Sequence, residues 1–193
     1  MLTIFFIIGI IIALTIHEFS HAYVADRLGD PTPRSYGRLT LNPLAHLDPL
    51  GTLMLFIARF GWGKPVPVDS YNLKNPKRDE ILISLAGPLS NIILAFVLGL
   101  VNRFFPNLLF IIFPIISINL SLAVFNLLPI PPLDGSKIFL NLLPVDTATQ
   151  WQEEITRFGP IILIALIFLP FAGGNLISLI ISPIITGLLK LIL

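Results

Sequence analysis

The chain has 193 residues, of which 55% are hydrophobic and only 12% charged, and its mean hydropathy is +0.90. Soluble domains carry about 25% charged residues, so this composition argues against a water-soluble globule. The formal net charge of +1 excludes the strongly basic surface that nucleic acids require, and the absence of cysteine excludes disulfides and Cys-ligated zinc. The length allows one compact unit, so the sequence predicts a small membrane protein whose environment is the lipid bilayer.

Four stretches are apolar and reach the roughly 20 residues that a helix needs to cross a bilayer core. They are Met1–Val24, Ile81–Asn102, Phe104–Leu133 and Phe158–Leu189. Pro170 and a turn at Gly173–Asn175 divide the last stretch into two expected passes, Pro160–Phe171 and Leu176–Leu193. No Lys or Arg precedes the first stretch and no cleavage site follows it, so we expect no cleaved signal peptide. The sequence predicts an all-α polytopic membrane protein with about five transmembrane helices.

The basic residues predict the orientation of these helices. Eight of the 12 Lys and Arg residues lie between the first two apolar stretches, whereas Arg103 alone separates the second from the third. Cytoplasmic loops carry the excess of Lys and Arg. Residues 25–80 and 130–158 are therefore expected in the cytoplasm, with the N-terminus outside and Lys190 inside. We expect a multi-pass protein of the cell membrane.

The segment between the first two stretches is not an ordinary loop. Asp48–Ile57 is apolar but too short to span, which predicts a re-entrant or interfacial segment. Arg38–Asn42 and Pro65–Asp69 alternate polar and apolar residues, which predicts two short strands, and the prolines restrict the second to a sheet edge. The sequence thus predicts a small β or re-entrant element after the first helix.

Further along the chain, residues 145–158 predict a cytoplasmic interfacial helix, capped by Asp146 or Thr147. Three aromatic side chains are typical of anchors at the membrane surface: Trp62, Tyr71 and Trp151.

The chemistry is concentrated in His17-Glu18-Phe19-Ser20-His21, inside the first apolar stretch. Residues four apart share one helix face, so both imidazoles can bind one metal ion, with Glu18 beside them to move protons. Carboxylates and imidazoles inside a membrane helix are costly and are functional by default. A chance match is the weaker explanation, and the motif predicts a metal site.

A catalytic zinc site takes three protein ligands, so a third must come from elsewhere. The best carboxylate is Asp134, which follows a run of prolines at positions 129, 131 and 132. These prolines predict that the third span unwinds just before Asp134, at the same inner depth as His17. The alternative is a proline-rich helix end with an exposed Asp-Gly turn.

Other polar residues in the spans have two interpretations each. Asn126 could donate to a developing oxyanion, or could form an ordinary hydrogen bond between helices. Gly87 and Asn91 favour small-residue packing with one polar contact. His46 lies outside any span and favours a satisfied interfacial histidine over a role near the substrate.

Three motifs together resemble the site-2 protease family: His17–His21, Ala86-Gly87-Pro88-Leu89-Ser90-Asn91, and the segment from Asn126 to Asp134-Gly135. Members are intramembrane zinc metalloproteases that cut membrane-spanning helices of other proteins. The resemblance covers a three-helix core, about residues 2–140, followed by C-terminal helices at about 145–193. It implies that His17, His21 and Asp134 bind one zinc ion, that Glu18 is the catalytic base and that Asn126 steadies the oxyanion.

The resemblance also implies a minimal form of the family. We expect residues 1–193 to be a single membrane-embedded domain, without an added PDZ or CBS domain and without the leading span of some members.

The predicted function is zinc-dependent hydrolysis of peptide bonds in transmembrane segments of membrane proteins, with the active site towards the cytoplasm. Two alternatives remain open at this point: a membrane metal transporter, and a protein that binds membrane helices without cutting them. An unwound substrate could add to an edge strand near the metal. Thr40, Leu41, Gly87 and Asn91 are the candidate substrate-binding residues.

Overall fold

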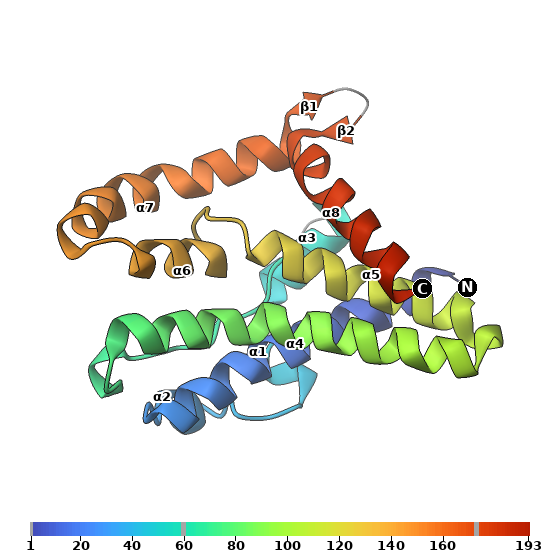
Figure 1. Ribbon diagram of the computed structural model, residues 1–193, viewed down its shortest axis with the longest axis horizontal. Helices are drawn as coiled ribbons and strands as arrows, with labels where there is room; N and C mark the ends of the chain where they lie inside the picture. Colours follow the sequence, from blue (N-terminus) through green and yellow to red (C-terminus); the bar gives the residue numbers. More distant parts are fainter. Residues whose placement is uncertain (1, 59–60, 172–173) are drawn as a thin grey trace.

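The computed structural model describes residues 2–58, 61–171 and 174–193, and the chain is mostly helical (Figure 1). Three long helices form its centre, and the remaining elements lie around them. In chain order the elements are α1 (Leu2–Leu28), α2 (Thr32–Ser35), the 3-10 turn η1 (Pro43–Ala45), α3 (Pro49–Ala58), η2 (Ser70–Asn72), α4 (Pro76–Phe104), η3 (Pro106–Leu108), α5 (Leu109–Asn126), α6 (Asp134–Leu142), α7 (Val145–Phe168), β1 (Pro170–Phe171), β2 (Gly174–Asn175) and α8 (Leu176–Ile192).

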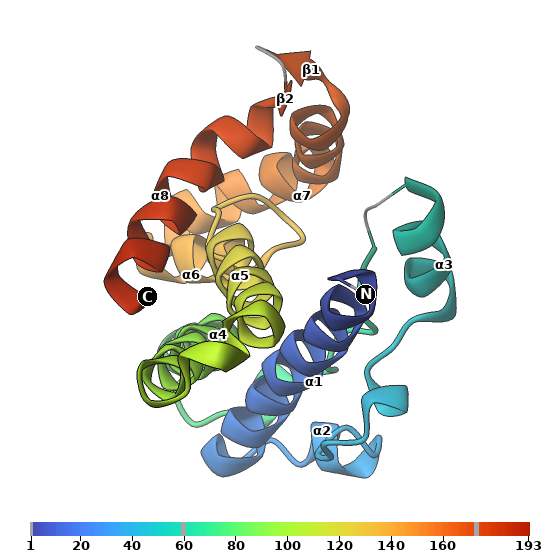
Figure 2. The same ribbon diagram turned by 90° about the vertical axis from the view of Figure 1, so that its right-hand side faces the viewer.

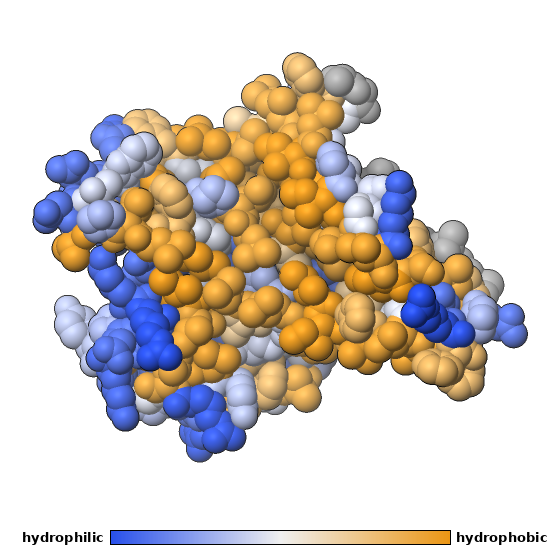
Figure 3. All heavy atoms as spheres, in the orientation of Figure 1, coloured by the Kyte–Doolittle hydropathy of each residue, from blue (hydrophilic) through white to orange (hydrophobic). Residues whose placement is uncertain are grey.

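Helices α1, α4 and α5 pack side by side, and each contacts the other two (Figure 2). Within the described residues, three segments are long and apolar enough to cross a membrane: Ile4–Leu28, Pro76–Phe104 and Pro106–Asn126. The surface is broadly hydrophobic over α4, α5 and α8. Most hydrophilic residues on this face gather at one end of the molecule, and smaller hydrophilic groups lie at the other (Figure 3). This distribution is that of an integral membrane protein, whose outer face contacts lipid.

The chain between α5 and α6 carries the third span back towards α1. Helix α5 ends at Asn126 because Pro129, Pro131 and Pro132 have no N–H to continue the helical ladder. Residues 127–133 are non-helical, and α6 begins at Asp134. The unwinding predicted before Asp134 is therefore confirmed, and it ends the third helix seven residues before the predicted Leu133.

The two predicted strands after the first helix are wrong. Residues 38–42 and 65–69 form no strand, and an isolated bridge between Leu47 and Gly63 is the only pairing in the described part of this segment. The Arg38 guanidinium donates to the backbone carbonyls of Lys64 and Pro65, which occupies acceptors that a sheet would use. The prolines of the second segment also lack the N–H groups that a sheet needs. The predicted re-entrant segment is a helix of ten residues, α3.

The C-terminal region also differs from the sequence prediction. The expected interfacial helix and the short pass after it form one continuous helix, α7, because Pro160 is accommodated inside the helix without ending it. The residue that precedes its first turn is Pro144, so neither Asp146 nor Thr147 caps it. The predicted turn at 173–175 falls partly outside the described residues. Asn175 caps α8 through a hydrogen bond to its Oδ1 from the Ser178 N–H, at 3.0 Å.

Candidate metal centre

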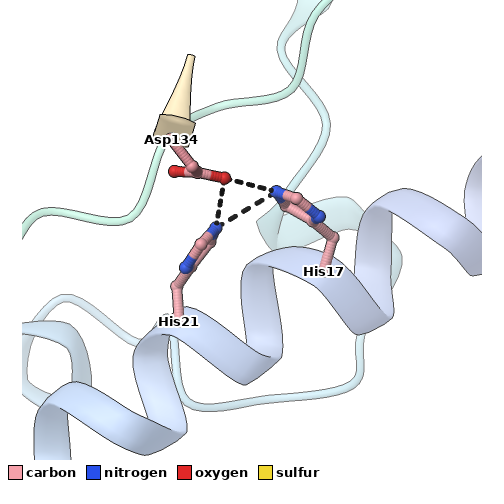
Figure 4. Close-up of side chains that lie close together, drawn as sticks. All are labelled: His17, His21 and Asp134. Carbon is pink, nitrogen blue, oxygen red and sulfur yellow. Dashed lines mark hydrogen bonds and ion pairs between the residues drawn. The ribbon is translucent and has the colours of Figure 1, made fainter. Parts of the chain in front are cut away.

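Three side chains meet where α1 faces the start of α6 (Figure 4). His17 and His21 lie one turn apart on α1, and their Nε2 atoms are 3.1 Å from each other. The Asp134 Oδ2 atom lies 3.2 Å from Nε2 of His17 and 3.1 Å from Nε2 of His21. All three residues are buried, with at most 8% of their surface exposed. The structure thus brings together the two histidines and the carboxylate that the sequence predicted.

The hydrogen bonds on the far side of each ring decide which nitrogen carries the hydrogen. The His21 Nδ1 atom lies 2.6 Å from the backbone oxygen of Ile83, and the His17 Nδ1 atom lies 2.7 Å from Oδ1 of Asn91. Both oxygens can only accept, so in the neutral rings both Nδ1 atoms are donors. The two Nε2 lone pairs therefore point at each other and at the Asp134 carboxylate.

Three lone pairs at these distances repel one another unless a cation lies between them. Zinc binds His nitrogen at about 2.0–2.1 Å, and tetrahedral angles then separate two ligand atoms by about 3.3 Å. The observed separations of 3.1–3.2 Å are close to that value. By donor chemistry and spacing, the residues fit a zinc ion.

Gly87 on α4 gives this group the space it needs. A Cβ atom at position 87 would lie 2.4 Å from Nε2 of His21 and 2.7 Å from Nε2 of His17. Any side chain here would therefore collide with both nitrogen atoms. Gly87 therefore packs directly against the two imidazoles, as small-residue packing at this position predicts.

Contacts at both ends of α6 hold Asp134 in place. A Cβ at Gly135 would lie 2.3 Å from the Leu127 backbone oxygen, so only glycine allows α6 to begin this close to the preceding loop. At the other end, Lys77 Nζ donates to the Leu143 backbone oxygen at 3.0 Å, and Asn141 donates to Glu80 at 2.7 Å. These bonds attach the end of α6 to the start of α4.

Glu18 is half-buried next to His17, and its Oε2 atom accepts a hydrogen bond from the Val66 N–H at 3.2 Å. The backbone at Val66 is held in turn by Arg38, whose guanidinium donates to the carbonyls of Lys64 and Pro65 and also to that of Ala45. Burial lowers the pKa of Arg38, although the nearby Glu18 charge opposes this. An extended backbone segment, rather than a strand, therefore lies against the Glu18 carboxylate.

The remaining predicted residues lie in different surroundings. Asn126 is half-buried at the end of α5, and its amide donates to the Leu122 backbone oxygen at 3.0 Å. Asn91 is fully buried, and its Oδ1 atom accepts a hydrogen bond from His17 Nδ1, which is a polar contact to another span's side chain of the kind that the sequence favours here. Leu41 is 61% exposed in a segment that bends after Arg38, and Thr40 is half-buried beside it.

His46 lies outside the long apolar helices, as the sequence predicts, and one of its ring nitrogens has a hydrogen-bond partner. Its side chain is fully buried in the segment between α1 and α4, where its Nε2 donates to the Thr40 backbone oxygen at 2.7 Å.

Comparison with known proteins agrees with this geometry. The model of the family described as "Peptidase family M50" matches residues 104–170. The chain is 41% identical over 181 residues to "Putative zinc metalloprotease YwhC" of Bacillus subtilis (strain 168), which covers 88% of this chain and 82% of that protein. The chain belongs to peptidase family M50. The predicted resemblance to the site-2 proteases is thereby confirmed.

Two further relatives also carry names of zinc metalloproteases. "Putative zinc metalloprotease Rip2" of Mycobacterium tuberculosis (strain ATCC 25618 / H37Rv) is 37% identical over 183 residues, which is 87% of this chain and 68% of that protein. "Zinc metalloprotease MJ0392" of Methanocaldococcus jannaschii is 28% identical over 135 residues, or 68% of this chain and 32% of that protein. No solved structure matches the chain significantly.

Sequence reasoning missed several contacts around this M50 site. Arg38 was predicted as a strand residue and as one of the charges that set orientation, not as a donor to backbone carbonyls near the site. The backbone groups at Ile83 and Val66 have no side-chain signal. Asn119 could have been found from the sequence, because it is an amide within an apolar span. Its side chain is fully buried.

Proposed function

We propose that this M50 chain is an intramembrane zinc metalloprotease that hydrolyses peptide bonds in or near transmembrane segments of other membrane proteins. The observation that carries the proposal is the convergence of two imidazole nitrogens and one carboxylate oxygen, all buried, on one point inside a membrane-spanning bundle. His17, His21 and Asp134 would hold one zinc ion per chain. When bound, zinc supplies Lewis acidity, which activates water as a nucleophile and polarises a carbonyl at neutral pH.

The residues of the chain supply the proton transfers. Glu18 lies beside His17 and is half-buried, so its carboxylate can take a proton from the attacking water and return it to the leaving amine. Asn126 uses one N–H on the Leu122 carbonyl, and the other N–H of the same amide is available to a developing oxyanion.

The substrate class follows from where the site lies. A helix that reaches it laterally through the bilayer hides its carbonyls in internal hydrogen bonds, so the segment to be cut must unwind first. Thr40 and Leu41, on the segment between α1 and α4, are candidates to contact the unwound chain.

We infer the membrane arrangement from the same chain. The apolar part of α7 and all of α8 are proposed as two further, shorter passes, which gives about five transmembrane helices in a single domain over residues 1–193. The basic residues between α1 and α4 favour a cell-membrane protein with its active site towards the cytoplasm.

Neither alternative explains the site as well. A metal transporter needs no base beside the ligands, and it needs further ligands along a path, whereas the described residues hold one such group of three. A protein that only binds helices needs neither Glu18 nor a three-ligand set.

The test measures bound zinc and cleavage on the same purified variants, with a panel of single-span substrates and with and without chelator. Glu18→Gln keeps the size of the side chain but removes the base, so zinc stays bound while cleavage falls by about 10²–10⁴-fold. His17→Ala instead lowers zinc content, because it removes one of three ligands. Full cleavage by Glu18→Gln contradicts the mechanism, and wild-type protein that binds zinc but cleaves no substrate contradicts the function.

A further inference from the structure

A continuous chain of buried hydrogen bonds runs from the metal centre through α4 to α5. Oδ1 of Asn91 lies 2.7 Å from Nδ1 of His17. The Asn91 amide nitrogen donates to the Ala13 backbone oxygen at 2.9 Å and to Oδ1 of Asn119 at 2.8 Å. The Asn119 amide nitrogen donates to the Ile115 backbone oxygen at 2.8 Å. Asn91 and Asn119 are both fully buried.

Each bond in this chain fixes the direction of the next. The Ile115 carbonyl only accepts, so the Asn119 amide must point its nitrogen there and its oxygen towards Asn91. Two acceptors, Asn119 Oδ1 and the Ala13 carbonyl, then take both N–H groups of Asn91. The Asn91 oxygen is thus left to face His17, and it can only accept a hydrogen from Nδ1.

The two histidines are held differently. His21 donates to the backbone of Ile83, and a helix carbonyl cannot rotate. His17 donates to a side-chain amide, which could flip and present its nitrogen instead. A flipped Asn91 would put an N–H against Nδ1 of His17, and the ring would then carry its hydrogen on Nε2, where a metal must bind.

We propose that Asn91 and Asn119 are positioning residues for the metal centre: Asn119 orients the Asn91 amide, and Asn91 keeps His17 protonated on Nδ1 so that its Nε2 can bind the ion. The proposal rests on the zinc site of the proposed function. It also explains why the third span carries a buried amide at a position that touches none of the three ligands.

The hydrogen-bond partner of a metal-binding histidine contributes about 10–100-fold to metal affinity. Asn91→Leu therefore weakens zinc binding by about that factor. Asn91→Asp keeps an acceptor for His17 but loses the N–H groups that bond to the Ala13 carbonyl and to Asn119, so it recovers part of the loss; a purely structural role predicts no recovery. Asn119→Leu costs about twofold to tenfold, the range of one hydrogen bond, because the Ala13 carbonyl still orients Asn91.

Asn119 acts only through Asn91, so the two effects are not additive. The variant carrying both Asn91→Leu and Asn119→Leu binds zinc no more weakly than Asn91→Leu alone. Asn102→Leu is the matched control, because it removes another amide from α4, and the Asn102 oxygen has no hydrogen-bond partner among the residues that the structure describes. We expect zinc affinity of this control within twofold of wild type.

Zinc dissociation constants would be measured by chelator competition on detergent-solubilised protein. Nitrogen NMR of the three histidines in zinc-free protein reports the tautomer directly. The proposal is supported if the His17 ring is protonated on Nδ1 in wild type and is a mixture of the two tautomers in Asn91→Leu. The zinc affinities of the variants must also follow the order given above. Equal affinities for wild type, Asn91→Leu and Asn119→Leu, or additive losses, overturn the proposal while leaving the zinc site intact. Wild-type protein that binds no zinc overturns the proposed function and this proposal with it.

Discussion

Gly87→Ala removes the space that the metal centre requires. The new methyl group would lie 2.4 Å from Nε2 of His21 and 2.7 Å from Nε2 and Cε1 of His17, where ordinary contact begins at about 3.4 Å. Relief requires a shift of about an ångström in two of three ligands that bind zinc at about 2.0–2.1 Å. Such a shift breaks the coordination, so we expect zinc affinity to fall at least 100-fold and cleavage to fall with it.

The same substitution favours the helix. Alanine in a helix interior is more stable than glycine by about 0.8–1 kcal/mol, so the folded protein is not expected to lose helix content. Zinc content, cleavage of a single-span substrate and helical circular dichroism would be measured on one preparation. Gly187→Ala on α8 is the matched control, because its Cβ meets nothing within 4 Å, and it should keep full zinc and activity. Wild-type zinc affinity and cleavage in Gly87→Ala would refute the role assigned to this glycine.

Two further predictions concern the segment between α1 and α4. Arg38→Ala frees the backbone beside Glu18, so hydrogen exchange in residues 61–69 should rise by about tenfold and cleavage should fall, while zinc content stays at one ion per chain. Loss of zinc without faster exchange would contradict this. Burial raises the pKa of Asp30, but hydrogen bonds from Thr32, the Asp69 N–H and Asn72 outweigh it and hold that pKa below its ordinary value. A lowered pKa stabilises the fold above the unfolded-state value of about 4, and this contribution is lost as the pH falls through the folded-state value. Asp30→Asn should therefore lower the melting temperature at pH 7, with a difference from wild type that narrows below about pH 4; a difference independent of pH would contradict the reasoning.

The metal ligands could be predicted from the sequence, because they are side chains in short local motifs. Two histidines four residues apart on a helix meet the same point, and prolines before Asp134 force the chain to turn there. The long apolar spans could be predicted from their length, and the resemblance to the site-2 proteases implied the three-helix core. Each of these predictions depends on local geometry, which the order of residues determines.

The predictions that failed depend on partners distant in sequence. Alternating polarity at residues 38–42 predicts a strand only if another strand supplies the hydrogen bonds, and Arg38 instead takes the carbonyls of the opposite segment. Residues 145–158 and Pro160–Phe171 were predicted as two separate elements, but Pro160 lies inside one continuous helix. The pattern of polar and apolar residues identifies neither the guanidinium that takes these carbonyls nor the packing around Pro160.

The sequence of helix α4 is matched to the two metal ligands on α1. Ile83, Gly87 and Asn91 are spaced four apart, so they occupy one face of α4, and that face meets His21 and His17 in the reverse order of the chain. Ile83 holds the His21 ring through its backbone oxygen, and Asn91 holds the His17 ring through its side-chain amide. Gly87, between them, leaves space for both rings. Pro88 lacks the N–H that would bond to the carbonyl four residues earlier, which loosens the helical ladder next to Ile83. The glycine-proline-asparagine pattern of the second span is therefore complementary to the two histidines of the first, and substitutions on either helix act on the same metal centre.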